Sequence, residues 1–457
     1  MKVQERSVDY AVQNQLTELR PLGEVIKPTR PRLKPSEKPH LPFIGMEHIE
    51  AHTMRLLGTV PASTMKSSAV HFQPGDVLYG RLRPYLNKVY RPDFEGLCSA
   101  EFIVFPKTAS LDSRYLQYFL NSTEFVSFAT HLNAGDRPRV DFDQLAPYPF
   151  PVVPLDQQKR IVAEIEKQFS RLDEAVANLK RVKANLKRYK AAVLKAAVEG
   201  RLVETEADRA RREGRSFETG AQLLQRILET RRSQWQGKGK YKEPAAPDTT
   251  DLPELPEGWV WTSLDSLIAD GPQNGIYLPK TLYGTGHPIL RIDDYQQDWI
   301  RPVTELQRVK AKPEDVTTYS LQSGDIVINR VNSLSHLGKV AVWAKEAEMP
   351  LFESNMMRAA LSSGVVPLYV ATYLRSLHGR ARLTKQAKWA VNQASINQQD
   401  VCGTPVPLPP LDEQNRIVAE VDLRLSVLRE TEAQVDANFQ RTNHLRQSIL
   451  SQAFASQ

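Results

Sequence analysis

One block of sequence occurs twice in this chain, and the duplication restricts the possible folds more than any other feature. The segment PLDQQKRIVAEI at 154–165 returns as PLDEQNRIVAEV at 410–421, a shift of 256 residues in a chain of 457. A long collinear repeat indicates two copies of one folding unit, so we expect an internal pseudo-twofold organisation. Further matching blocks lie upstream in the same order: Gly75-Asp76 with Gly324-Asp325, and Tyr115-Leu116 with Tyr369-Val370.

The first part of each copy has the pattern of a mixed α/β domain. Short runs of β-forming residues, bounded by turn signals, indicate strands at 102–105 and 326–328. Apolar residues at helical spacing indicate short amphipathic helices at 115–119 and 369–374. We therefore expect the α/β fold class, with two similar domains at 1–154 and 251–409.

Each copy ends in a long helical pattern, at 155–200 and at 410–457. Apolar residues recur mostly at intervals of three, four or seven, and no Pro or internal Gly interrupts them. Such a seam needs a partner helix, and the other copy is the nearest one available. The expected interface residues are Ile161, Ile165, Leu172, Leu179 and Leu186 in the first helix, and Ile417, Val421, Leu425, Leu428 and Val435 in the second.

A helix of about 40 residues is about 60 Å long, so an antiparallel pair of them would separate the two domains. The alternative is a helical hairpin without a spacing role. Between the copies, 201–250 is expected to be a linker with one short amphipathic helix at 221–228, and 237–250 has the composition of a flexible segment. The second domain opens at Leu255-Pro-Glu-Gly-Trp259.

The first domain lacks that Gly-Trp opening, so its start is less clear. The nearest counterparts of Trp261, Leu264 and Leu267 are Leu19, Leu22 and Val25.

The net charge of +7 is compatible with nucleic-acid binding but does not establish it. Its distribution is more informative, because 159–195 holds eleven basic against four acidic residues, and a second basic cluster occupies 375–388. The basic face of the first helix is either solvated or in contact with DNA or an acidic partner. Its members are Lys180, Arg181, Lys183, Lys187, Arg188 and Lys190.

The chain carries no complete motif for catalysis or metal binding. It has no Gly-x-x-x-x-Gly-Lys-Ser/Thr loop and no adenine-methylation signature, and 24–27 holds only half of a nuclease motif. His48 and His52 have the spacing of metal ligands but no third partner, so we expect solvated or locally bonded imidazoles. The two cysteines, Cys98 and Cys402, are expected to be buried apolar residues. An enzyme that cleaves or methylates DNA itself is therefore disfavoured.

No apolar run is long enough for a transmembrane helix, and the first residues lack the pattern of a signal peptide. We expect a cytoplasmic protein.

Several of these segments resemble one family. PLDEQNRIVAE from Pro410 resembles the opening of the long helix in specificity subunits of type I restriction–modification systems. LPEGW at 255–259 resembles the opening of their second target recognition domain, and EGRL at 199–202 followed by LLxxI at 223–227 is also similar. Together these motifs cover nearly the whole chain in the expected order.

The resemblance implies a non-catalytic subunit that recognises a bipartite, asymmetric DNA target, with the paired helices setting the unread gap. It implies two methylation subunits that use S-adenosylmethionine to methylate adenine, and restriction subunits that use ATP and Mg²⁺. No cofactor is expected in this chain itself. The alternative is a coiled-coil adaptor that binds only protein.

Residues that contact DNA are expected on turn-like loops. Arg and Lys neutralise phosphates, whereas Arg on guanine and Asn or Gln on adenine read base edges in the major groove. The candidates in the first domain are Arg81, Arg83, Asn87, Lys88, Arg137 and Arg139. Those in the second domain are Arg330, Asn332, Lys388, Asn392 and Gln393.

Overall fold

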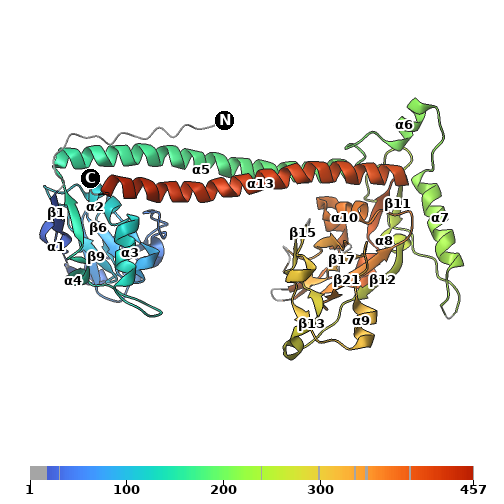
Figure 1. Ribbon diagram of the computed structural model, residues 1–457, viewed down its shortest axis with the longest axis horizontal. Coiled ribbons are helices and arrows are strands. Elements are labelled where there is room, and N and C mark those ends of the chain that lie inside the picture. Colours follow the sequence, from blue (N-terminus) through green and yellow to red (C-terminus); the bar gives the residue numbers. More distant parts are fainter. Residues whose placement is uncertain are drawn as a thin grey trace. The chain divides into compact units, whose positions relative to one another are not determined.

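The computed structural model describes residues 18–29, 31–237, 239–296, 299–333, 336–344, 348–390 and 393–455. The chain divides into two compact units: unit 1 comprises Met1–Arg181 and Val435–Gln457, and unit 2 comprises Val182–Gln434. Each unit contains one α/β domain together with a part of each of the two long helices (Figure 1).

The domain of unit 1 is built on two sheets whose strands are short and largely buried. The strand orders are β2-β5-β8-β3-β4 and β7-β6-β9, and among the described strands of these two sheets only the β3–β8 pair is parallel. The strands are β2 (Arg32–Leu33), β3 (Pro42–Ile44), β4 (Val60–Pro61), β5 (Ala69–Phe72), β6 (Val77–Gly80), β7 (Val89–Tyr90), β8 (Gly96–Cys98) and β9 (Phe102–Phe105).

Helices α2 (Ser113–Phe119) and α3 (Thr123–His131) follow the sheets of unit 1. Both begin at side-chain caps, since the Asp112 carboxylate accepts from the amides of Arg114 and Tyr115, and the Ser122 hydroxyl accepts from the Phe125 amide. The remaining elements of this domain are β1 (Glu18–Pro21), α1 (Leu22–Val25), α4 (Phe142–Leu145) and β10 (Pro149–Val152).

Unit 2 repeats this plan with longer connections. Its main sheet has the order β12-β21-β17-β19, beside smaller sheets β16-β13-β20, β18-β23-β22, β14-β15 and β11-β24. The strands are β11 (Val260–Ser263), β12 (Ile268–Asn274), β13 (Tyr283–Leu290), β14 (Tyr295–Gln296), β15 (Trp299–Ile300), β16 (Arg308–Val309), β17 (Ile326–Asn329), β18 (Val331–Asn332), β19 (Val340–Val342), β20 (Leu351–Phe352), β21 (Met356–Leu361), β22 (Lys388–Ala390), β23 (Gln393–Ser395) and β24 (Pro405–Leu408).

The described residues of the linker form α6 (Glu206–Glu213) and α7 (Gly220–Ser233), and both helices belong to unit 2. The other short helices of unit 2 are α8 (Leu264–Leu267), α9 (Pro313–Tyr319), α10 (Pro367–Arg375), α11 (Leu377–Leu383) and α12 (Gln398–Cys402). The Glu206 carboxylate pairs with Arg416 at 2.6 Å, and the Glu206 amide donates to the buried Glu413 carboxylate at 2.8 Å. These contacts attach the linker to the second long helix. Only one short helix was predicted in the linker, whereas its described residues form both α6 and α7.

The repeat is visible in matched hydrogen bonds. Strand β1 pairs with β10 and β11 with β24, and the amide after each first strand donates to an equivalent carbonyl: Leu22 to Tyr148 at 2.9 Å, and Leu264 to Thr404 at 2.8 Å. Helices α1 and α8 therefore occupy equivalent places. Leu19 and Leu22 thus hold the same places in unit 1 that Trp261 and Leu264 hold in unit 2.

Two residues of the duplicated blocks make the same contacts in both units. The buried amides of Gln158 and Gln414 each accept from a main-chain N–H, of Asp112 at 2.7 Å and Val366 at 2.9 Å. Each also donates to a carbonyl five residues earlier in the chain.

The hydroxyls of Tyr115 and Tyr369 donate to the carbonyls of Pro151 and Pro407, respectively. Burial raises the pKa of both phenols, which keeps them protonated donors.

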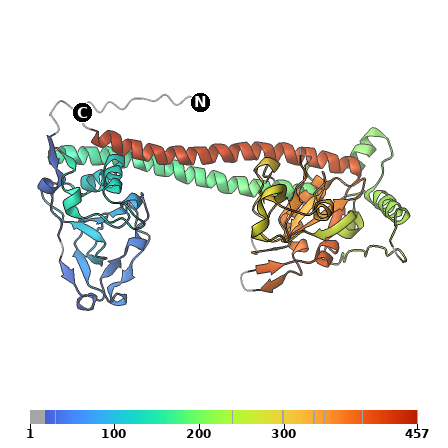
Figure 2. The ribbon, with the colours of Figure 1, turned by 60° about the horizontal axis from the view of Figure 1, so that its bottom comes forward.

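The long helices are α5 (Leu155–Val198) and α13 (Leu411–Phe454). In unit 1 the start of α5 packs against the end of α13, where Ile165 and Phe169 share a core with Ile449 and Leu450. In unit 2 the end of α5 packs against the start of α13, where Val193 and Leu194 share a core with Leu425. The two helices are therefore antiparallel within each unit, as Figures 1 and 2 show.

The expected seam residues differ in burial. Ile165, Ile417, Val421, Leu425, Leu428 and Val435 are buried. Ile161, Leu172, Leu179 and Leu186 are half-buried.

The cysteines differ from each other, because Cys98 is buried but Cys402 is only half-buried. This corrects the expectation that both are core residues. Burial nevertheless raises the pKa of the Cys402 thiol to about 11.

Candidate nucleic-acid interface

In unit 1 the two candidate loops lie against each other. The Val140 amide donates to the Arg81 carbonyl at 3.0 Å, and the Arg83 amide donates to the Pro138 carbonyl at 2.7 Å. An antiparallel bridge joins Leu82 to Arg139. Residues some 55 positions apart in sequence thus form one surface that carries several guanidinium groups.

Unit 2 has the same junction. The Ile396 amide donates to the Arg330 carbonyl at 2.9 Å, which is the counterpart of the Val140–Arg81 bond. Strand β18 then pairs with β23, and β23 pairs with β22 to form a hairpin. The backbone framework is shared by the two units, whereas the side chains that it presents differ.

The four arginines of the two loops in unit 1 fall into two groups, those with a carboxylate partner among the described residues and those without one. Arg81 is paired with Asp141, and Arg139 is paired with Glu101 at 2.7 Å. Arg137 is exposed, and Arg83 has a left-handed backbone at φ +53° as the residue before the short helix Pro84–Leu86. Arg137 and Arg83 are the arginines of this loop pair for which no carboxylate partner is found among the described residues.

Two candidates of unit 1 are engaged inside the domain. Asn87 is 2% exposed, and its amide donates to the Asn121 oxygen at 2.6 Å. The Lys88 ammonium donates to the Met46 carbonyl at 2.5 Å. Asn87 therefore supports the loop from within, which corrects its expected place among the DNA-contacting side chains.

In unit 2, Lys388 and Gln393 are exposed on the β22–β23 hairpin. Arg330 is half-buried and donates to the Ser354 carbonyl at 3.1 Å. Asn392 lies outside the described residues, and Asn332 is placed by its backbone in β18. Trp389 was not among the predicted DNA-contacting residues, but it is 69% exposed beside Lys388. Its position between basic and amide residues could have identified it from the sequence, because aromatic rings stack on bases.

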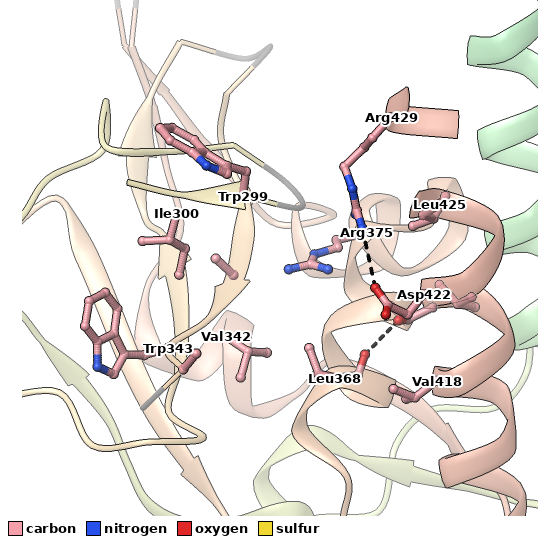
Figure 3. Close-up of a pocket in the computed structure, with 14 residues that line it drawn as sticks. Trp299, Ile300, Val342, Trp343, Leu368, Arg375, Val418, Asp422, Leu425 and Arg429 are labelled. Atoms are coloured by element: carbon pink, nitrogen blue, oxygen red, sulfur yellow. Dashed lines mark hydrogen bonds and ion pairs between the residues drawn. The ribbon is translucent and has the colours of Figure 1, made fainter. Parts of the chain in front are cut away.

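Unit 2 also has a mainly apolar hollow of about 310 Å³ between the β14–β15 hairpin and α13 (Figure 3). Trp299 and Ile300 face Val418 and Leu425 across it, and Asp422 and Arg429 form an ion pair at 3.5 Å. In unit 1 the positions that correspond to Thr372 and Leu425 hold Tyr118 and Phe169, whose rings contact edge to face. No described member of the candidate DNA-contacting set lines this hollow.

Within the described ranges, no three His, Cys, Asp or Glu side chains are grouped to hold a metal ion. His48 is locally bonded, because its Nδ1 accepts from the Gly45 amide at 2.9 Å, which confirms the expectation for this imidazole. Among the described helices, none combines the length and the apolar character that a bilayer crossing requires.

Comparison with known proteins points to one family. Residues 13–188 match the family described as "Type I restriction modification DNA specificity domain". The putative MjaX specificity subunit of Methanocaldococcus jannaschii is 34% identical over 37% of this chain and 40% of its own length. The EcoKI specificity subunit of Escherichia coli K12 is 24% identical over 79% of this chain and 67% of its own, and the StySPI subunit of Salmonella potsdam is 26% identical over 75% and 65%.

The alignments thus span between two fifths and two thirds of the length of these relatives. Among solved structures, a chain from a study of type I restriction–modification assembly and conformational transition superposes with a TM-score of 0.67 at 20% identity, over 97% of this chain and 99% of that one. The HsdS subunit of Thermoanaerobacter tengcongensis superposes with a TM-score of 0.50 at 21% identity, over 96% of each chain. Both likenesses show the fold.

Every finding agrees with the others, from the duplicated α/β domains and antiparallel helices to the family match and the named relatives. Residues 13–188 match the DNA specificity domain of type I restriction–modification systems, and the chain is similar to specificity subunits of these systems over most of its length.

Proposed function

We propose that this chain is the DNA-reading subunit of a type I restriction–modification complex and that each unit reads one half of a bipartite, asymmetric target. The observation that carries this proposal is the pair of equivalent loop junctions, one per unit, built by the same main-chain bond at Arg81 and Arg330. A common framework with different side chains fits two readers with different sequence preferences. Phosphate contacts position each unit, and base contacts specify the sequence.

The two long helices set the unread gap between the half-sites. Each helix is continuous over 44 residues, and each contributes one part to unit 1 and the other part to unit 2. A spacer made of regular helices changes length only in steps of its rise per residue, which suits a fixed number of base pairs.

The chemistry belongs to partner subunits. Two methylation subunits supply S-adenosylmethionine-dependent adenine methylation, and restriction subunits supply ATP- and Mg²⁺-dependent cleavage, in the cytoplasm. The chain itself reads DNA without a cofactor. The alternative, an adaptor that binds only protein, gives no reason for paired basic loops at the same place in both units.

Mapping of methylated adenines in a genome that carries this chain and its partners tests the proposed function. The expected result is one motif with two specific half-sites of different sequence separated by unread positions. A continuous motif or a perfect palindrome would contradict the proposal.

Exposed apolar residues on the helices mark the surface where a partner subunit binds. Leu423 and Val427 are 60% and 58% exposed, and they lie one turn apart on α13. Changing both to Ser is expected to weaken co-purification with the methylation subunits at least about tenfold, because each buried aliphatic side chain contributes roughly 1.5–3 kcal/mol. The chain alone should melt as before. Leu377→Ser, which changes a 78% exposed residue on α11, is the matched control and should bind normally.

A further inference from the structure

Unit 2 contains a polar pocket of about 420 Å³ beside the β22–β23 hairpin. Arg382, Lys385 and Lys388 line one part of it, and Lys388 is also the first residue of the hairpin. Asp248 of the linker and Asp251, the first residue of the second domain, line another part. The pocket therefore joins a candidate DNA-reading element to the segment that precedes the second domain.

The cations of this pocket are available to an anionic ligand. Lys385 and Lys388 are exposed, and neither ammonium group has a hydrogen bond or salt bridge with a described residue. Arg382 donates to the Asp251 carbonyl at 2.6 Å, so its side chain is held at the pocket by a neutral main-chain acceptor. Cations that converge without a carboxylate bonded to them are suited to binding a phosphate group.

Two of the three carboxylates that line the pocket, those of Asp248 and Asp400, accept hydrogen bonds from groups other than its cations. The Asp248 carboxylate accepts from the Thr250 hydroxyl at 2.7 Å and from the Thr250 amide at 3.0 Å. These bonds, together with Lys385 and Arg382, hold the pKa of Asp248 below its usual value, so this group is charged at neutral pH. Asp400 accepts from the Asn397 amide at the start of α12.

We infer that this pocket binds a backbone phosphate of the DNA that the hairpin reads, and that the linker carboxylate at Asp248 competes with that phosphate for Lys385 and Arg382. The inference deepens the proposed function and rests on it. A phosphate next to the hairpin fixes how the hairpin enters the groove, without reading sequence itself. The Asp248 carboxylate therefore lowers the affinity of unit 2 for DNA, because the phosphate has to compete with it for Lys385 and Arg382.

Equilibrium binding of the full chain tests this inference, with a duplex that carries the mapped target and a duplex of unrelated sequence. Lys385→Gln is expected to weaken binding to both duplexes roughly fivefold to tenfold at 0.1 M salt and to lower the salt slope by about 0.9, because one phosphate contact is lost. Lys312→Gln, an exposed lysine of unit 2 outside the pocket, is the charge-matched control and should change neither quantity.

Asp248→Asn keeps the oxygen that accepts from Thr250 but removes the charge. It is expected to tighten binding of both duplexes about threefold in the native background and to have no effect in the Lys385→Gln background. Equal affinity of Lys385→Gln and Lys312→Gln would overturn the phosphate site, and an equal gain from Asp248→Asn in both backgrounds would overturn the competition. Failure of the unchanged chain to prefer its target would instead count against the proposed function.

Discussion

Replacing Gln414 by Leu is expected to destabilise unit 2 by about 2–6 kcal/mol. The buried Gln414 amide accepts from the Val366 amide at 2.9 Å and donates to the Pro409 carbonyl at 3.0 Å. Leucine occupies a similar volume but leaves both main-chain groups without a partner, and each such group costs about 1–3 kcal/mol when it is withheld from water. The substitution therefore removes the link between α13 and the start of α10.

The same change at Gln158 should act on unit 1, because Gln158 bonds Asp112 and Val153 in the equivalent way. All six tryptophans lie in unit 2, so tryptophan fluorescence during urea unfolding reports that unit alone. Gln414→Leu should lower the fluorescence midpoint, whereas Gln158→Leu should act mainly on the circular-dichroism transition.

Asn415→Leu, one residue further on the exposed side of α13, is the control for Gln414→Leu. Equal shifts for the neighbouring substitutions would show that the buried hydrogen bonds contribute nothing measurable.

These two glutamines illustrate what the sequence reveals about the fold. Their positions in the repeated block are visible by inspection, and so are the long helices, because a regular apolar period over 44 residues is a local signal. The role of the glutamines is not visible, since it depends on amides 46 and 48 residues away in the chain. The linker helix α6 was missed for a similar reason: its charged sequence is anchored by Arg416, which lies 210 residues later.

The candidate interface shows the same division. Turn-like loops with basic residues could be selected from local composition, and the structure brings the two loops together in each unit. The direction in which a single side chain points could not be predicted from local composition. Asn87 has the chemistry of a base reader, but a left-handed backbone and the amide of Asn121 direct it inward. Conversely, the pocket at Lys385 forms only because the linker and α11 meet in space.

Insertion of one heptad into both long helices is expected to reduce methylation at native targets by at least about 100-fold. The insertion points are after Arg181 in α5 and after Gln434 in α13, where each helix passes from one unit to the other. Seven residues lengthen each helix by about 10.5 Å and keep the apolar seam nearly in phase. A half-site that can no longer be reached loses several base contacts worth about 1–3 kcal/mol each, which accounts for the size of the loss.

The lengthened subunit should prefer the same two half-sites with about three more base pairs between them, since 10.5 Å corresponds to about three steps of 3.4 Å. Recovery should be partial, because three base pairs rotate the second half-site by about 100° whereas a heptad rotates the helix by only about 20°. A heptad inserted in α5 alone is the control. It shifts the apolar residues of α5 relative to those of α13, so it should abolish methylation at targets of every gap length. If the doubly lengthened subunit kept the native gap, the helices would not set the spacing, and the two units would have to find their half-sites independently.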